Sequence, residues 1–110
     1  MTNRNFTQTV TVHCSDVDAL VALLTEWDEL QARADVMGYA GTRILADRAT
    51  PGVFVIEADF GVVDPDVSAY EEALRNNERP QTQEWARRLR ELTAAEPEYR
   101  HYDEVYRTGF

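Results

Sequence analysis

Hydrophobic residues recur in this chain with two different periods, and the order of those periods constrains the fold more than any single motif. Stretches in which every second residue is apolar are typical of strands, and apolar residues at steps of three and four are typical of helices. From the N-terminus the order is strand, helix, strand, strand, helix, strand. This order predicts an α+β, ferredoxin-like fold, β-α-β-β-α-β, in which a four-stranded antiparallel sheet carries its helices on one face.

Turn and capping residues set the expected limits of these elements. Ser15 is expected to cap the first helix, and Pro51-Gly52 matches the central pair of a type II turn between the two middle strands. Pro65 is expected to begin the second helix, where its missing N–H costs nothing. Because proline disrupts the interior hydrogen bonds of a helix, Pro80 is expected to split this second helical region in two. The predicted ranges are 6–14, 15–38, 40–50, 52–60, 64–77, 80–95 and 99–108.

Length, charge and cysteine content limit the classes of protein to consider. The chain has 110 residues, which suits one domain, residues 1–110. Its net charge of −9 argues against nucleic acid and anionic membrane surfaces as partners, because both attract basic proteins. No apolar run is long enough to span a membrane and the polar N-terminus lacks a signal-peptide core, so a cytoplasmic protein is expected. A single cysteine, Cys14, excludes an internal disulfide and a cysteine-based metal cluster.

The stretch GVFVIEADF, residues 52–60, raises the question of what the second face of the sheet contacts. Alternation places Phe54, Ile56, Ala58 and Phe60 on one face and Val53, Val55, Glu57 and Asp59 on the other. If the helices cover the first face, the chain leaves the second face bare. A surface that mixes valine, threonine and acidic residues is too apolar for easy solvation and too polar for a dry core. We therefore expect a homodimer that pairs this helix-free face with that of a second copy.

Three stretches resemble a known family. They are FTQTVTV at the start, GYAGTRILADRATPGVFVIEADF across the central hairpin and NNERPQTQEWARRL in the last helical region. Together they resemble the dimeric α/β barrel superfamily, and in particular its antibiotic-biosynthesis-monooxygenase-like domains. The resemblance implies a homodimer with a pocket between each sheet and its helices, or within the barrel that two sheets enclose.

The same resemblance implies an activity. Members of the family include oxygenases that need no cofactor and act on quinols and polyketide aromatics, as well as haem-degrading enzymes that bind iron through a helix histidine. No histidine occurs between Asp64 and Glu98, where that ligand belongs, so neither haem nor another cofactor is expected. The implied function is a cofactor-independent monooxygenase that acts on a small aromatic or quinol substrate.

Two residues are candidates for catalysis. His13 lies on a strand expected to face the barrel interior, and histidine is the side chain best suited to removing a proton from a phenol or quinol near neutral pH. Tyr102, in the last strand, is the candidate tyrosine for the same step. The alternative for His13 is a structural histidine at the end of its strand, beside the start of the first helix.

Five residues are candidates for the substrate pocket, and each has a structural alternative: Trp27, Glu57, Asp59, Tyr70 and Trp85. The aromatic residues suit a planar apolar ligand, but their helical spacing also suits core packing. The acids form either a coupled pair in the pocket or ion pairs with Arg43, Arg48 or Arg107. His101 with these acids offers ligands for a divalent metal, yet the absence of a closely spaced ligand pair favours an ordinary edge-strand histidine, and no metal site is expected.

Two further functions remain open at the level of the sequence. The chain could be a ligand-binding or accessory barrel without turnover, or a dimerisation module whose helix-free face is wholly interface. Only the likeness of fold favours the enzyme over these alternatives.

Overall fold

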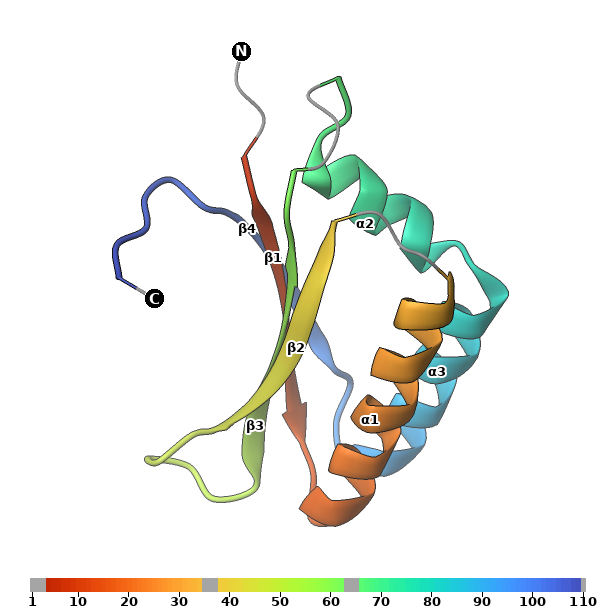
Figure 1. Cartoon of the computed structure of the whole chain (residues 1–110). Coiled ribbons are helices and arrows are strands. Elements are labelled where there is room, and N and C mark those ends of the chain that lie inside the picture. Colours follow the sequence, from red (N-terminus) through yellow and green to blue (C-terminus); the bar gives the residue numbers. More distant parts are fainter. Residues whose placement is uncertain (1–3, 35–37, 63–65, 110) are drawn as a thin grey trace.

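The computed structural model describes residues 4–34, 38–62 and 66–109, which form one antiparallel sheet with three helices packed on one of its faces (Figure 1). The elements are β1 (Phe6–His13), α1 (Val17–Ala34), β2 (Tyr39–Ala46), β3 (Val53–Phe60), α2 (Ala69–Asn77), α3 (Pro80–Leu92) and β4 (Glu98–Asp103). The predicted order β-α-β-β-α-β is confirmed, with the second helix split at Pro80. None of the helices within the described residues has the length and apolar character needed to cross a membrane.

The strand order in the sheet is β2-β3-β1-β4, and every neighbouring pair is antiparallel. The central pair, β1 and β3, is aligned so that Phe6 lies opposite Phe60 and His13 opposite Val53. The β2–β3 hairpin closes at the predicted turn, in which Val53 N–H donates to the Thr50 carbonyl and Gly52 has a φ of +85°. A positive φ at the third turn position is what a type II turn requires and what glycine tolerates.

Two details of the helices differ from the prediction. The carboxylate of Asp16, not Ser15, caps α1, because its Oδ1 accepts the backbone N–H of Ala19 at 3.0 Å. The predicted helix start at Asp64-Pro65 lies outside the described residues, and α2 is described from Ala69.

The last strand is shorter than predicted. It ends at Asp103, so Tyr106, which falls inside the predicted range 99–108, lies beyond the strand and is 80% exposed. The register of β4 with β1 runs from Glu98 opposite Thr11 to Asp103 opposite Phe6. One further backbone hydrogen bond follows, from Glu104 N–H to the Asn5 carbonyl, before the chain leaves the sheet.

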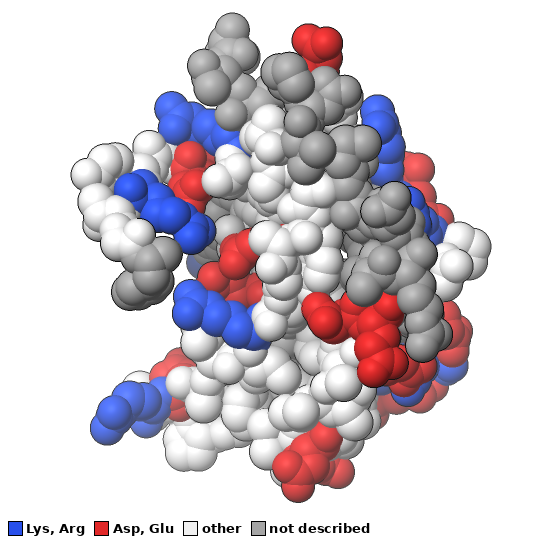
Figure 2. Space-filling view, viewed as in Figure 1, with Lys and Arg blue, Asp and Glu red and all other residues white. Residues whose placement is uncertain are grey.

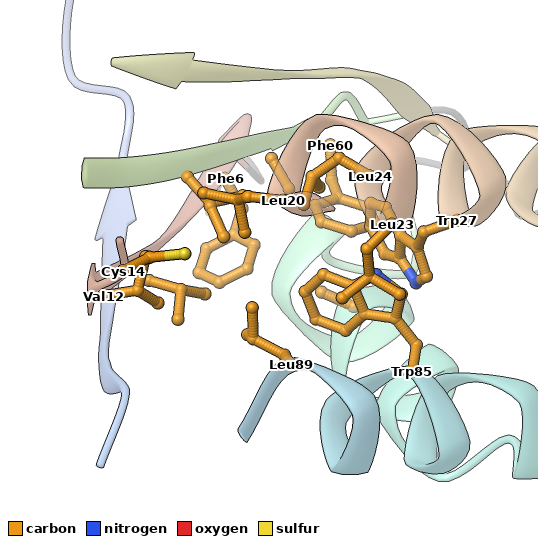
Figure 3. Packing of buried hydrophobic residues seen from close by; sticks show 14 of the residues in the cluster. Phe6, Val12, Cys14, Leu20, Leu23, Leu24, Trp27, Phe60, Trp85 and Leu89 are labelled. Carbon is orange, nitrogen blue, oxygen red and sulfur yellow. The ribbon is translucent and has the colours of Figure 1, made fainter. Parts of the chain in front are cut away.

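The core lies between the sheet and the helices, as Figure 3 shows from close by. Phe6, Val12 and Ile56 contribute from the sheet, and Leu20 and Leu89 from the helices; all are at most 2% exposed. Cys14 is buried. Among residues 17–29 of α1, whose burial is described, the buried ones are Leu20, Leu23, Leu24 and Trp27.

Candidate functional site

A cavity of about 270 Å³ lies between the sheet and the helices α1 and α3. Its floor is the helix-covered face of the sheet, where Val10, Ile56, Ala58 and Phe60 are buried. This volume is near the lower end of the range for small-molecule sites, about 300–1,000 Å³. The cavity therefore suits a compact, largely apolar molecule.

Two tryptophans form one wall of this cavity. Trp27 comes from α1 and Trp85 from α3, and their ring centroids are 5.3 Å apart with an angle of 36° between the planes. Tyr39, at the start of β2, meets the Trp27 ring edge-on at a centroid distance of 5.4 Å. Its hydroxyl lies 2.7 Å from the Asp28 carboxylate and 2.6 Å from the Thr42 hydroxyl. The wall is thus held by packing and by hydrogen bonds behind it.

Polar side chains line the cavity on the side of the edge strand β4. Gln8 of β1 and His101 of β4 lie directly opposite each other in the sheet, and both line the cavity. Tyr99, two residues before His101, also lines it, and partial burial raises the pKa of its phenol. Thr82 and Gln83 join them from the first turn of α3. His101 is a solvent-exposed residue, so the imidazole lies at the mouth of the cavity.

Tyr70 of α2 does not line the cavity but packs behind its mouth. Its ring makes an edge contact with His101 at 5.7 Å and with Phe6 at 5.2 Å between centroids. The His101 imidazole also lies 5.5 Å from the Phe6 ring. The Tyr70 ring thus packs against a residue of the cavity lining, and its predicted role in the substrate pocket stays a prediction.

The opposite face of the sheet, which no helix covers, has a different character. We call it the helix-free face; its residues form cross-strand rows Gly41–Asp59–Thr7–Tyr102, Arg43–Glu57–Thr9–Arg100 and Leu45–Val55–Thr11–Glu98, followed by Val53–His13. Two interactions tie neighbouring strands across it. Asp59 Oδ1 accepts the Thr7 hydroxyl at 2.7 Å, and Arg43 Nη2 lies 3.1 Å from Glu57 Oε1. Figure 2 shows basic and acidic side chains side by side along this side of the molecule.

The structure thus divides the predicted site residues between two faces. Trp27 and Trp85 line the cavity, and Glu57 and Asp59 lie on the helix-free face, where both are half-buried. Glu57 makes the ion pair with Arg43 that the alternative predicted, whereas Asp59 accepts a hydrogen bond from the Thr7 hydroxyl.

The two predicted catalytic residues also lie away from the cavity. His13 ends β1 on the helix-free face with its side chain exposed, and its backbone carbonyl accepts the Ala94 N–H at 2.8 Å. Tyr102 is 48% exposed on the same face. Neither residue can reach a molecule in the cavity of its own chain, because the sheet separates them.

His101, Glu57 and Asp59, the set considered as metal ligands, do not lie together in the structure. His101 pairs with Gln8 on the helix-covered face, whereas Glu57 and Asp59 point to the other face. Within residues 4–34, 38–62 and 66–109, no group of three or more histidine, cysteine or acidic side chains is arranged to hold a metal ion.

Sequence reasoning missed Gln8, Tyr99 and His101 as cavity residues. Gln8 carried a usable signal, since it is the one polar residue on a strand face shared with Phe6, Val10 and Val12. A polar residue on a core-facing position is expensive to bury and often marks a cavity. The register then places His101 beside Gln8, but that pairing is not readable from the sequence.

Comparisons with known proteins agree on the fold. No family model matches the sequence, and no curated protein matches it. A solved structure from Nitrosomonas europaea, described provisionally as an antibiotic biosynthesis monooxygenase, superposes with a TM-score of 0.72 at 16% identity, covering 99% of this chain and 98% of the other. A point mutant of SnoaB, a cofactor-independent oxygenase from Streptomyces nogalater, gives 0.69 at 18% identity, with 94% and 96% covered.

A third solved structure, Rv0793 from Mycobacterium tuberculosis, gives a TM-score of 0.68 at 12% identity and covers 96% of this chain and 99% of its own. At these identities the likeness establishes architecture, and it extends over nearly the whole length of both chains. The chain therefore has the same ferredoxin-like fold as these solved structures, two of which are described as antibiotic biosynthesis monooxygenase or cofactor-independent oxygenase.

Proposed function

We propose that the chain is a cofactor-independent monooxygenase that acts on a small aromatic or quinol substrate bound in the cavity between the sheet and α1 and α3. The observation that carries this proposal is the cavity itself, with two tryptophans on one side and a histidine at its mouth. The fold shared with a cofactor-independent oxygenase supports the reaction class by analogy.

A quinol can supply all the electrons for such a reaction. It takes up one oxygen atom on a ring carbon and becomes a hydroxyquinone, while the second oxygen atom leaves as water: quinol + O₂ → hydroxyquinone + H₂O. The protein must hold the ring, remove a phenolic proton and shield the anion from water. The tryptophan wall and the apolar floor do the first and third of these.

His101, rather than His13, is the residue we assign to proton removal. Its imidazole lies at the cavity mouth, and histidine is the side chain most often used as a general base near neutral pH. Gln8, directly opposite on β1, offers a side-chain amide to position a substrate oxygen beside it. His13 lies across the sheet from this position.

Oxygen uptake with 1,4-naphthalenediol tests the proposal. Protein freed of metal by a chelator should consume oxygen faster than the diol does spontaneously. With ¹⁸O₂, one labelled oxygen atom should appear in the hydroxynaphthoquinone product. His101→Gln should lower kcat at least tenfold, because general-base catalysis contributes about 10²–10⁴ in rate. His13→Ala is the matched control and should not change kcat.

The outcomes separate the alternatives. Loss of activity in His13→Ala but not in His101→Gln would move the site to the helix-free face. If the diol binds but oxygen uptake does not exceed the spontaneous rate, the chain is a ligand-binding barrel without turnover. This is the second candidate function, and the same cavity supports it.

We also propose that the helix-free face pairs two copies of the chain. On this face Val55 and the threonines are half-buried, Leu45 is 40% exposed, and the C-terminal residues carry further exposed apolar side chains at Val105 and Tyr106. In Figure 1 the helices lie entirely on the other side of the sheet. A two-fold axis would bring this face onto its own copy.

Sedimentation velocity tests the pairing. The wild-type chain should sediment as a dimer at micromolar concentration, and Val55→Lys should shift it to a protomer, because two-fold symmetry places each substitution in the interface twice. Arg87→Lys, on the exposed side of α3, is the control and should leave the dimer intact. A wild-type protomer at these concentrations would refute the pairing.

A further inference from the structure

A polar side chain lies on the core-facing side of the central strand β1. The residues of this strand that point to the helices are Phe6, Gln8, Val10 and Val12, and the three apolar ones are at most 3% exposed. Gln8 lies between two of them, is half-buried and lines the cavity. A leucine at this position would complete the apolar floor without the cost of burying an amide, so the glutamine calls for an explanation.

The Gln8 carboxamide is unpaired but accessible. It has no hydrogen-bond partner within the described part of the chain, whereas Thr82 and Gln83, which line the cavity from α3, have interactions of their own. Among the described residues, the unpaired side-chain atoms that are closed off from solvent are the indole nitrogens of Trp27 and Trp85. The amide atoms of Gln8 are not among them and keep accessible surface. A molecule in the cavity can therefore bond to this amide.

The cavity lining is divided by polarity. The polar side chains on its floor, Gln8, Tyr99 and His101, all come from β1 or the edge strand β4. The lining residues of β3 are apolar, and the Trp27 and Trp85 rings lie side by side between α1 and α3, as Figure 3 shows. Because His101 is exposed at the mouth, the polar end of the cavity is the end that opens to solvent.

We propose that the Gln8 carboxamide is the polar anchor of this cavity and determines its specificity. The bound ring system carries its oxygen substituents at one end only, toward β1 and β4, and places its hydrocarbon end against Trp27 and Trp85. This assignment deepens the proposed function, on which it rests for an aromatic ligand. The described lining contains no acid, lysine or arginine, so the anchor is a neutral donor and acceptor.

The carboxamide serves both oxidation states of such a ligand. Its oxygen accepts a hydrogen bond from a hydroxyl group, and its N–H groups donate to a phenolate or a ring carbonyl. Gln8 and His101 lie directly opposite each other, and such cross-strand neighbours have Cβ atoms about 4.5–5.5 Å apart. An oxygen held by Gln8 therefore lies at the same end as the imidazole. An oxygen at the other end would lose its hydration among apolar side chains.

Two isomeric diols test this orientation without turnover. In 1,3-naphthalenediol both hydroxyl groups are on one ring, whereas 1,5-naphthalenediol has one on each ring, so the isomers differ only in where the oxygens lie. Isothermal titration calorimetry under argon measures binding while no oxygen can be consumed. Wild-type protein should bind the 1,3-isomer about three- to tenfold more tightly, because the 1,5-isomer must bury a hydroxyl group among apolar side chains.

A substitution at Gln8 then identifies the anchor. Gln8→Met keeps the length of the side chain and removes its amide, so it should weaken binding of 1,3-naphthalenediol about three- to tenfold without weakening binding of naphthalene. Gln81→Met is the matched control, since Gln81 is exposed in the first turn of α3 and does not line the cavity. It should leave both affinities unchanged.

Equal affinities of wild-type protein for the two diols would overturn the orientation, and this comparison needs no variant to fold. A Gln8→Met variant that binds 1,3-naphthalenediol as tightly as wild type, or that loses the diol and naphthalene equally, would overturn the anchor. If the isomer preference and its dependence on Gln8 are found but the oxygen-uptake assay fails, the anchor is retained and the monooxygenase is rejected.

Discussion

The two faces of the sheet are formed by the same strands but differ in what covers them and in how their side chains are stabilised. On β3, Ile56, Ala58 and Phe60 point to the helices and are nearly inaccessible to solvent, whereas Val55, Glu57 and Asp59 point the other way and stay half-buried. The first face is closed by the chain's own helices and encloses a cavity. The second is covered by no helix and holds its polar groups by cross-strand contacts.

The difference shows where stability and binding reside. The helix-covered face is stabilised by the removal of apolar area from water, about 25 cal/mol per Å². The polar groups that line its cavity are amides, hydroxyls and an imidazole. The side chains of the helix-free face add little to the stability of one protomer, because partly exposed ion pairs contribute little free energy in water. The valines and threonines of this face would contribute to stability only when a second surface covers them and excludes water.

Neighbouring residues on β3 give the largest expected contrast. Ile56→Ala should lower the free energy of unfolding by about 2–5 kcal/mol, since it leaves a void in a packed core. Val55→Ala, one residue earlier on the opposite face, should cost about 1 kcal/mol or less at low protein concentration. Urea unfolding of both variants measures the difference, and equal costs under dilute conditions would show that the helix-free face is already covered within one protomer.

A second, smaller effect should appear at alkaline pH, where the buried Tyr39 phenol on the helix-covered side affects the stability of the fold. Burial raises the pKa of the Tyr39 phenol, and the nearby Asp28 carboxylate adds to the shift. The unfolded chain therefore releases this proton near pH 10 while the folded chain keeps it, so the stabilisation is complete below about pH 10 and is lost as the pH rises further.

Tyr39→Phe is the variant that isolates this effect. It should cost about 1 kcal/mol at pH 7 through lost hydrogen bonds, and it should flatten the decline in stability above pH 10. Unfolding in denaturant at pH 7 and pH 11 compares the two proteins. An unchanged slope with pH would mean that the phenol is not held neutral by the fold.

The smallest expected effect concerns the ion pair on the helix-free face. A double-mutant cycle on Arg43 and Glu57 should give a coupling of about 0.2–1 kcal/mol, since the two side chains are 64% and 20% exposed. The pair Arg88–Glu26, which joins α3 to α1 with both partners about half exposed, is the control and should lose its coupling at a lower salt concentration. A coupling for Arg43–Glu57 that grows with protein concentration would support pairing of two copies on this face.

Prediction of the helix faces shows one limit of sequence patterns. Val17 and Val21 fit the same steps of three and four as Leu20 and Leu24, yet Val17 and Val21 are 40% and 47% exposed, and Leu23 is buried instead. Rotation of a helix by one residue preserves the period and changes which side chains are inside. Only the position of the helix over the sheet decides between such stripes.

The candidate site shows a second limit. Trp27 and Trp85 were expected at a pocket because large aromatic residues favour such places, and they line the cavity. Their roles, like those of the other candidates, stay predictions. His101 was weighed as a metal ligand with Glu57 and Asp59, and the register separates it from both acids. Residues far apart in the chain meet according to strand register and helix placement, which local patterns do not encode.

The sequence by itself determined the order of the strands and helices, the turn at Pro51-Gly52 and the two sets of residues on β3, because periodicity and backbone restrictions act over a few residues. The tertiary structure decided which face the helices cover, that the Trp27 and Trp85 indoles meet without an acceptor in the described part of the chain, and that His101 shares their cavity while His13 does not. Those outcomes depend on how α1 and α3 pack across the sheet, where volumes and buried polar groups must fit together at once.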